Sequence, residues 1–290
     1  MARLLISRRG LVLGSGAGLV AAAAGIRPAH AQSTLERVRE QGFIRIGFAN
    51  EAPYGYATPS GELTGEAPEV AKAVLERMGI AEVDGVLTEF ASLIPGLKAG
   101  RFDIIAAGMF VSPKRCEQIA FSEPTYGMGQ AFLVAEGNPK GVKTYDDFAN
   151  DSDLRLGVMA GAIEKQFAED SGVDMSKVQT YPDGPSALAA VRAGRIDGFP
   201  LTSLSINNLV KTAGEGSGVE ATPSFSEIAG SYVRGHGAFG FRKEDQALLD
   251  AFNAQLKEFI GSEDHLALVE PFGFDKNTLP EKTTEELCAG

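Results

Sequence analysis

Apolar strand-like runs alternate with amphipathic helical stretches along the first part of the chain. The strand-like runs are short and rich in β-branched, aromatic or small apolar residues, and they lie at residues 43–48, 83–90 and 103–107. Between them, the apolar positions and a closing glycine predict helices at residues 68–78 and 92–100. This strand–helix–strand–helix–strand order predicts a parallel sheet covered by helices.

A second region of the chain repeats this alternation of strands and helices. Strands are expected at residues 154–159 and 178–181, and helices at residues 163–170 and 186–193. Residues 195–202 are expected to form the last strand and its exit loop. The helix at 163–170 follows a glycine turn. Such a turn at a helix start presents free N–H groups that can bind an anion, although many strand–helix junctions share this pattern.

The two regions share a local sequence echo. Ala-Gly-Arg-Phe-Asp at residues 99–103 returns as Ala-Gly-Arg-Ile-Asp at residues 193–197. The echo supports an α/β protein with two similar lobes. We expect residues 32–134 to form the first part of lobe 1, residues 135–232 to form lobe 2, and residues 233–290 to return to lobe 1 and end in a tail.

The N-terminus has the composition of an export signal. Three arginines precede an apolar run rich in glycine and alanine, and a small-x-small cleavage site ends at Ala31. Arg8 and Arg9 also resemble a twin-arginine signal. The apolar run has about 16 residues, fewer than the roughly 20 that cross a bilayer, so an anchor is disfavoured. We therefore expect residues 1–31 to be removed and the protein to be periplasmic.

Charge narrows the range of partners. The 290-residue chain carries 27 basic and 38 acidic side chains, a net charge of −11, and residues 1–31 hold four arginines and no acid, so the mature charge is about −15. An acidic protein of this kind is unsuited to nucleic acid. Two cysteines and three scattered histidines do not make a zinc site, and we expect neither a metal nor a cofactor.

One motif carries most of the chemical information. The strand at residues 103–107 ends at Gly108, and Ser112 followed by Pro113 is typical of a helix start. This arrangement projects Phe110 and Arg115 from the strand end and the first helical turn. A guanidinium at that place can bind a planar carboxylate through two parallel hydrogen bonds, whereas an arginine taken alone is more often a partner in a surface ion pair.

The motif also carries a family resemblance. Gly-Met-x-x-Ser-Pro-x-Arg at residues 108–115, Phe-Ser-x-Pro at 121–124 and Gly-Gln-x-x-x-Val at 129–134 resemble the periplasmic solute-binding proteins of amino-acid ABC transporters, family 3. The resemblance implies a type II periplasmic-binding-protein-like fold, in which two lobes with mostly parallel sheets and flanking helices are joined by a two-strand hinge. It further implies a monomer that binds a small solute, docks on a membrane permease and catalyses no reaction.

The resemblance also assigns roles to individual residues. It implies that Arg115 binds the α-carboxylate of the solute and that the turn at Gly161 donates backbone N–H groups to the same carboxylate. The junction after the first strand adds Glu51 and Tyr54 as candidates. In this family the C-terminal tail returns to lobe 1, which favours a disulfide between Cys116 and Cys288 over a buried thiol and a free one.

Two departures from the family pattern concern the solute. Thr202 stands where many members place an aspartate for the α-ammonium group, and Phe110 stands where many have Ser or Thr. Together with Glu51, Tyr54 and Phe90, these residues suit a zwitterion whose cation is delocalised and packs on aromatic faces. This set resembles the ectoine/hydroxyectoine-binding proteins, although each aromatic residue taken alone is more often part of a core.

Two alternatives remain open from the sequence. The first is a binding protein for a polar or cationic amino acid. The second is a periplasmic dehydratase on the same fold, in which Glu51 in an aromatic pocket would act as a general acid. The sequence shows no nucleophile–base pair, phosphate loop or metal cluster to support an enzyme.

Overall fold

The computed structural model describes residues 32–290, and Ser33–Gly290 form one compact unit. The signal peptide expected at residues 1–31, with its cleavage site after Ala31, lies outside the described residues. Among the described residues, no helix has the length and apolar character needed to cross a membrane.

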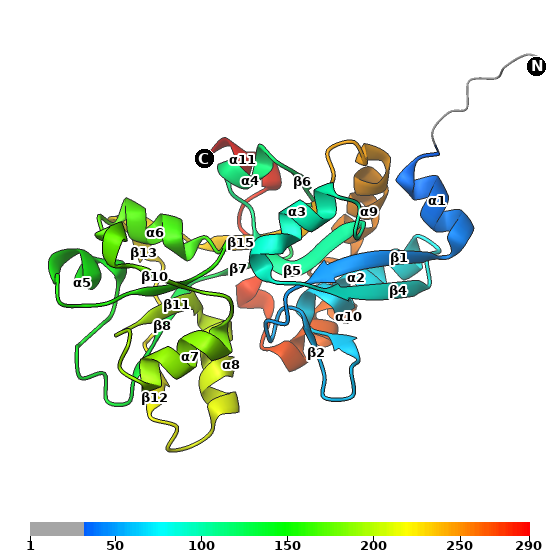
Figure 1. Ribbon diagram of the computed structural model, residues 1–290. Helices are drawn as coiled ribbons and strands as arrows, with labels where there is room; N and C mark the ends of the chain where they lie inside the picture. Colours follow the sequence, from blue (N-terminus) through cyan, green and yellow to red (C-terminus); the bar gives the residue numbers. More distant parts are fainter. Residues whose placement is uncertain (1–31) are drawn as a thin grey trace, which may run out of the picture. The chain divides into compact units, whose positions relative to one another are not determined.

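The first sheet contains both parallel and antiparallel strands (Figure 1). Strand β1 pairs in parallel with β4 and β5, and β15 then runs antiparallel to β5. The strand order is β4-β1-β5-β15-β6, and β7 also pairs with β15. The bounds are β1 Phe43–Phe48, β4 Glu82–Leu87, β5 Ile104–Phe110, β6 Ala120–Phe121, β7 Tyr126–Met128 and β15 Gly235–Phe241.

Helices pack on this sheet through apolar faces, as the sequence pattern predicts. Val70, Val74 and Leu75 of α2 are fully buried, and they join one core with Ile44 and Ile46 of β1. The helices of this part are α1 Thr34–Gln41, α2 Glu66–Arg77, α3 Leu93–Lys98, α9 Gln246–Phe259 and α10 Glu263–Val269. Shorter elements here are β2 Tyr56–Ala57, β3 Leu63–Thr64, η1 Phe90–Ser92, η3 Glu270–Phe272 and η4 Lys276–Thr278.

The strands of the second region also mix directions. Strand β8 pairs antiparallel with β11 and β12, whereas β9 and β10 pair in parallel. A parallel bridge between Leu156 and Gly198 connects the two groups. The strands are β8 Gln130–Ala135, β9 Gly157–Met159, β10 Gln179–Tyr181, β11 Phe199–Thr202, β12 Val219–Ala221, β13 Glu227–Ile228 and β14 Ser231–Tyr232. The helices are α5 Tyr145–Asn150, α6 Glu164–Asp170, η2 Met175–Lys177, α7 Gly184–Arg192 and α8 Ser203–Ala213.

Three local differences from the sequence expectation stand out. The strand expected at 83–90 ends at Leu87, and Phe90 begins the 3₁₀ turn η1. Residues 195–202 were expected to end in an exit loop, but strand β11 continues to Thr202 and helix α8 begins at Ser203. The sheets are mixed rather than mostly parallel, because β15 and β8 run against their neighbours where the chain passes between the lobes.

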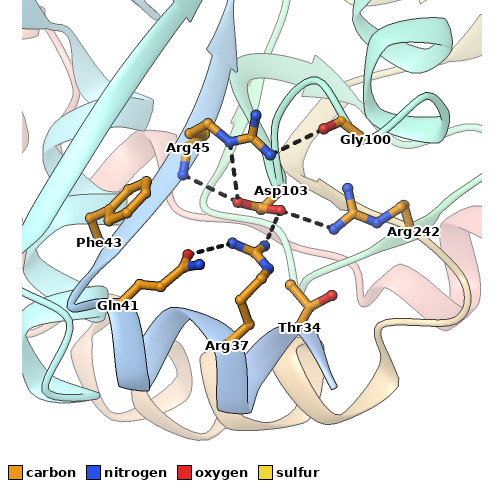
Figure 2. Close-up of a pocket in the computed structure, with 8 residues that line it drawn as sticks. All are labelled: Thr34, Arg37, Gln41, Phe43, Arg45, Gly100, Asp103 and Arg242. Atoms are coloured by element: carbon orange, nitrogen blue, oxygen red, sulfur yellow. Dashed lines mark hydrogen bonds and ion pairs between the residues drawn. The ribbon is translucent and has the colours of Figure 1, made fainter. Parts of the chain in front are cut away.

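The sequence echo corresponds to the same hydrogen bond made twice. Asp103 Oδ2 accepts from the backbone N–H of Arg45 (3.3 Å), and Asp197 Oδ2 accepts from that of Arg155 (2.8 Å). Around Asp103, Arg37 and Arg242 add two further contacts, so three arginines converge on one carboxylate that is 1% exposed (Figure 2). This cluster fixes α1 and the segment after β15 to the first sheet.

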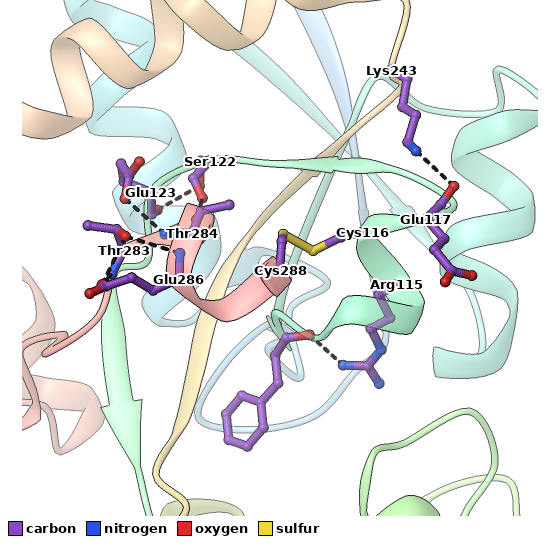
Figure 3. The surroundings of a disulfide bond; sticks show 11 residues. Arg115, Cys116, Glu117, Ser122, Glu123, Lys243, Thr283, Thr284, Glu286 and Cys288 are labelled. Carbon is purple, nitrogen blue, oxygen red and sulfur yellow. Dashed lines mark hydrogen bonds between the residues drawn. A yellow bond between two sulfur atoms is a disulfide. The ribbon is translucent and has the colours of Figure 1, made fainter. Parts of the chain in front are cut away.

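The C-terminal tail is fastened to the element that carries Arg115. A disulfide joins Cys116, the last residue of α4 (Pro113–Cys116), to Cys288 in α11 (Thr284–Ala289) (Figure 3). Thr284 Oγ1 also donates to the carbonyl of Ser122. The tail therefore helps to hold the position of α4, the helix that carries Arg115.

Candidate solute-binding site

Arg115 lies buried where α4 begins after β5. Pro113 occupies the first turn, as the sequence predicts, and Arg115 is 8% exposed. Its Nη1 donates to the carbonyl of Phe110 (2.7 Å), and its Nη2 donates to the carbonyl of Gly161 in the other lobe (3.0 Å). Burial lowers the pKa of Arg115 to about 10, so the guanidinium stays cationic at neutral pH.

One aromatic ring lies beside the guanidinium, and three others form a cluster in the same part of lobe 1. The centre of the Phe90 ring lies 5.6 Å from the Arg115 Cζ atom, and Tyr126 links the rings of Tyr54 and Phe110 at centroid distances of 5.0 and 6.0 Å. Gly108 has a φ of +61°, and a Cβ atom there would lie 2.4 Å from the Tyr54 ring. Only glycine therefore fits at this position of β5, two residues before the strand ends at Phe110, because the Tyr54 ring packs directly on its backbone.

Two acidic side chains reach the same place from opposite lobes. Glu51, in the loop after β1, accepts a hydrogen bond from Ser205 Oγ of α8 (2.6 Å), and burial raises its pKa. Glu164, the first residue of α6, is 3% exposed, and burial raises its pKa to about 7. With its amide oriented to satisfy its neighbours, Gln130 donates to Glu164 Oε1 (3.0 Å).

These side chains enclose a small cavity between the lobes. Lobe 1 lines it with Glu51, Tyr54, Phe90, Gly108, Phe110 and Arg115, and lobe 2 with Met159, Ala162, Ile163, Glu164, Leu201 and Thr202. The volume of the cavity is about 30 Å³. A cavity needs at least about 10–15 Å³ of such space to hold one water molecule, so this one holds little more than water, and an organic solute enters only when the lobes separate.

The structure brings six of the seven expected site residues to this cavity, and Gly161 lies at its border. Gly161 has a φ of +75°, and a Cβ atom there would lie 2.7 Å from Ala91 Cα of lobe 1. Its carbonyl, rather than its N–H, contacts Arg115 in this conformation. Thr202 lines the cavity and also caps α8, since its Oγ1 accepts from Ser205 N (3.3 Å). The contacts of these seven residues with a solute remain predictions.

Sequence reasoning missed Glu164 and Ser205. Glu164 follows the glycine turn by three residues, and that turn was predicted only to offer backbone N–H groups. Ser205 lies in α8, a helix that the sequence pattern did not predict. Neither residue carries a local signal for its role, because the partner of each comes from a distant part of the chain.

A family model decides the classification. The model of the bacterial extracellular solute-binding proteins, family 3, matches residues 44–274. The chain belongs to this family. Within the family it is 38% identical over 263 residues, 88% of this chain and 86% of the relative, to a probable amino-acid ABC transporter periplasmic-binding protein, y4tE, of Sinorhizobium fredii (strain NBRC 101917 / NGR234).

Two solved structures of similar family proteins set the structural context. The crystal structure of EhuB in complex with hydroxyectoine is 38% identical and covers 89% of this chain and 98% of that chain, with a TM-score of 0.81. The ancestral amino acid-binding protein AncCDT-1, a precursor of cyclohexadienyl dehydratase, is 27% identical and covers 83% and 99%, with a TM-score of 0.71. The expected type II two-lobed fold is confirmed.

Metal chemistry finds no support in the part of the chain that the structure describes. No group of three or more His, Cys, Asp and Glu side chains among residues 32–290 is arranged to hold a metal ion. One cation, two acids and three aromatic rings line the cavity. This is a composition that suits reversible binding of a small charged solute.

Proposed function

We propose that the protein is the periplasmic solute-binding component of an amino-acid-type ABC importer. We further propose that its solute is a small zwitterion with a carboxylate and a delocalised cation, of the ectoine or hydroxyectoine type. The single observation that carries the proposal is the position of Arg115 beside the Phe90 ring, in a cavity that Tyr54, Phe110 and the acid Glu51 also line. Such a site offers complementary places to the two charges of one small molecule.

Each half of the solute has its own partner. Arg115 has five N–H donors, of which the contacts with Phe110 and Gly161 use two, so the guanidinium retains donors for a carboxylate. The rings of Phe90, Phe110 and Tyr54 offer faces to the cation, each contact contributing about 0.5–2 kcal/mol. Glu51 supplies an acceptor for N–H groups of the cation.

The solute acts by stabilising the closed arrangement of the lobes. Two hydrogen bonds, from Arg115 to Gly161 and from Ser205 to Glu51, already cross between the lobes. Clefts of about 700 Å³ on the Arg115 side and about 430 Å³ on the Glu51 side flank the small cavity. Opening along these clefts admits the solute, and closure around it produces the form that docks on a permease.

The experiment is calorimetric titration of the protein, without residues 1–31, with ectoine and hydroxyectoine. Glycine betaine, proline, glutamine and arginine are titrated beside them. We expect saturable binding of the ectoines and loss of binding in Arg115→Ala. Arg37→Ala is the matched control, because Arg37 is a partly buried arginine in the Asp103 cluster, remote from the cavity. Binding of other solutes with no heat from either ectoine would contradict the proposal.

A cationic amino acid is a second candidate, favoured by the charge of the cavity. Two acids, Glu51 and Glu164, face one basic residue, Arg115, so a solute with net positive charge would balance the site. The arginine titration separates this candidate from the first. A dehydratase remains the least supported alternative. Incubation with a carboxylated cyclohexadiene tests it, and we expect no turnover.

Export and oligomeric state belong to the same proposal. We propose that residues 1–31 are removed after Ala31, and N-terminal sequencing of the protein from the cell envelope tests the site. We also propose a monomer, because one chain contributes both walls of the cavity. Size-exclusion chromatography with light scattering checks the mass with and without solute.

A further inference from the structure

Glu164 is a buried acid that the binding scheme above does not use. It lines the cavity from lobe 2, whereas Glu51 lines it from lobe 1. In the described part of the chain, no ion pair within 4.0 Å joins Glu164 to a basic side chain, and its neighbour Gln130 donates only a neutral amide N–H. A buried carboxyl group placed in this way is suited to receive a cation from outside the protein.

We propose that Glu164 is a second acidic ligand of the solute, so that Glu51 and Glu164 each accept one N–H group of an amidinium held between the lobes. The inference rests on the proposed function and names the chemistry that the site recognises. An amidinium spreads one positive charge over two nitrogen atoms, and in a cyclic amidinium the two N–H groups point apart. Two carboxyl groups that approach from opposite lobes match this arrangement.

The charged neighbours of Glu164 support this role. Arg115 and Glu51 face it across the cavity, Tyr145 of α5 packs behind it, and Gln130 of β8 contacts its Oε1. Arg115 carries the single positive charge among these groups. When a solute carboxylate binds to Arg115, it offsets part of the attraction between the guanidinium and the two acids, Glu51 and Glu164. The cationic half of the same solute then supplies a new positive charge to both acids.

The arrangement predicts a specificity that aromatic rings alone do not provide. A quaternary ammonium, as in glycine betaine, packs on aromatic faces but has no N–H group. Its binding would offer no N–H donor to the carboxyl groups of Glu51 and Glu164, and sites built to hydrogen-bond a solute reject analogues that lack the donor. We expect glycine betaine to bind at least a hundredfold more weakly than ectoine.

The arrangement also links binding to protons. Burial raises the pKa of Glu164 to about 7, and a bound cation lowers it again because it favours the carboxylate. Solute binding therefore releases a proton where Glu164 is protonated beforehand, and affinity falls as the pH drops below 7. Burial raises the pKa of Glu51 as well, so Glu51 contributes to the same trend.

Calorimetry of Glu164→Gln tests the inference, with Glu66→Gln as the matched control. Glu66 is 1% exposed and burial raises its pKa to about 7, but it accepts from Thr125 Oγ1 and does not line the cavity. Titrations with ectoine at pH 5.5 and 8, in two buffers of different ionisation enthalpy, give both the affinity and the number of protons released. Glu164→Asp shows whether a shorter acid restores part of the effect.

We expect the unchanged protein to bind at least tenfold more weakly at pH 5.5 than at pH 8 and to release protons at the lower pH. At pH 8, Glu164→Gln should bind ectoine at least tenfold more weakly than the unchanged protein does. The ratio of its affinities at pH 8 and pH 5.5 should be at least threefold smaller than the same ratio for the unchanged protein. Glu66→Gln should behave as the unchanged protein does. A merely structural role of Glu164 would lower affinity without changing the number of protons released.

Two results would overturn the inference while the proposed function stands. One is ectoine binding by Glu164→Gln with unchanged affinity and pH dependence. The other result is ectoine binding by the unchanged protein without any release of protons between pH 5.5 and 8. This second result decides the question even if Glu164→Gln does not fold. Failure of the unchanged protein to bind any ectoine would instead refute the proposed function itself.

Discussion

Ser205 Oγ donates a hydrogen bond to Glu51 Oε1 at 2.6 Å, although the two residues are 154 positions apart and belong to different lobes. Ser205 is 1% exposed, and Thr202 Oγ1 accepts from its backbone N–H at the start of α8. The bond joins two side chains of the protein itself. It therefore stabilises the closed arrangement of the lobes and holds the acid that the proposed solute would contact.

Loss of this bond should open the empty protein. A hydrogen bond to a group that can be charged contributes about 1.5 kcal/mol, so Ser205→Ala should lower the ratio of closed to open molecules roughly tenfold. Small-angle scattering of the solute-free variant should show a larger radius of gyration. Thr212→Ala is the control, because Thr212 Oγ1 contacts Asn208 within the same helix. Equal scattering curves for the two variants would contradict the prediction.

Phe110 offers a test of the aromatic contribution that preserves packing. Phe110→Leu keeps an apolar side chain against Tyr126 but removes the ring face. We expect solute affinity to fall between about threefold and thirtyfold, which corresponds to a cation–π contribution of about 0.5–2 kcal/mol. Calorimetry gives the affinity, and thermal melting confirms that the fold is kept. An unchanged affinity would assign Phe110 to the core alone.

Gly161 and Gly172 form a matched pair of glycines. Both have positive φ values, +75° and +81°, so alanine strains the backbone by about 1 kcal/mol at either place. Only at Gly161 does the added Cβ meet the other lobe, 2.7 Å from Ala91 Cα, whereas the space at Gly172 is open. Gly161→Ala should weaken solute binding at least tenfold. Gly172→Ala should lower the melting temperature to a similar extent and bind normally.

Glu66 predicts how stability changes with pH. Its pKa is about 7 in the folded protein because of burial and roughly 4.3 in the unfolded chain. A raised folded-state pKa means that the unfolded state ionises first, so this acid lowers the free energy of unfolding as the pH rises from about 4 to 7. Glu66→Gln keeps an acceptor for Thr125 and should raise the melting temperature at pH 8 but not at pH 4. A parallel shift at both values would contradict this assignment.

The sequence pattern predicted the elements that depend on local order. The strand expected at 43–48 has the bounds of β1, and Ser112 with Pro113 correctly predicted the start of α4. Helix α8 was not predicted, because it follows strand β11 with no loop between them. Thr202 is both the last residue of that strand and the N-cap of the helix. The antiparallel course of β15 was also missed, because direction within a sheet depends on pairing with distant strands.

The site was predictable to the extent that single residues reveal their chemistry. Arg115 and Phe110 belong to one continuous motif, and the family resemblance pointed to Glu51 and Tyr54 after the first strand. Ser205 acts through a partner on the opposite lobe, and Glu164 through its place in the cavity wall. An acid at a helix start and a serine in a helix are both ordinary in sequence, and burial in three dimensions makes each of them unusual.

The disulfide between Cys116 and Cys288 closes a ring of chain with a sequence separation of 172 residues. All of residues 135–232 belong to that ring, as do both passages between the lobes. A protease that cuts the backbone at one place inside the ring leaves two pieces still joined covalently, one of them carrying Arg115 and its neighbour Cys116. A receptor that works outside the cytoplasm can thus be nicked in an exposed loop of lobe 2 and remain one molecule, which electrophoresis reveals only after reduction.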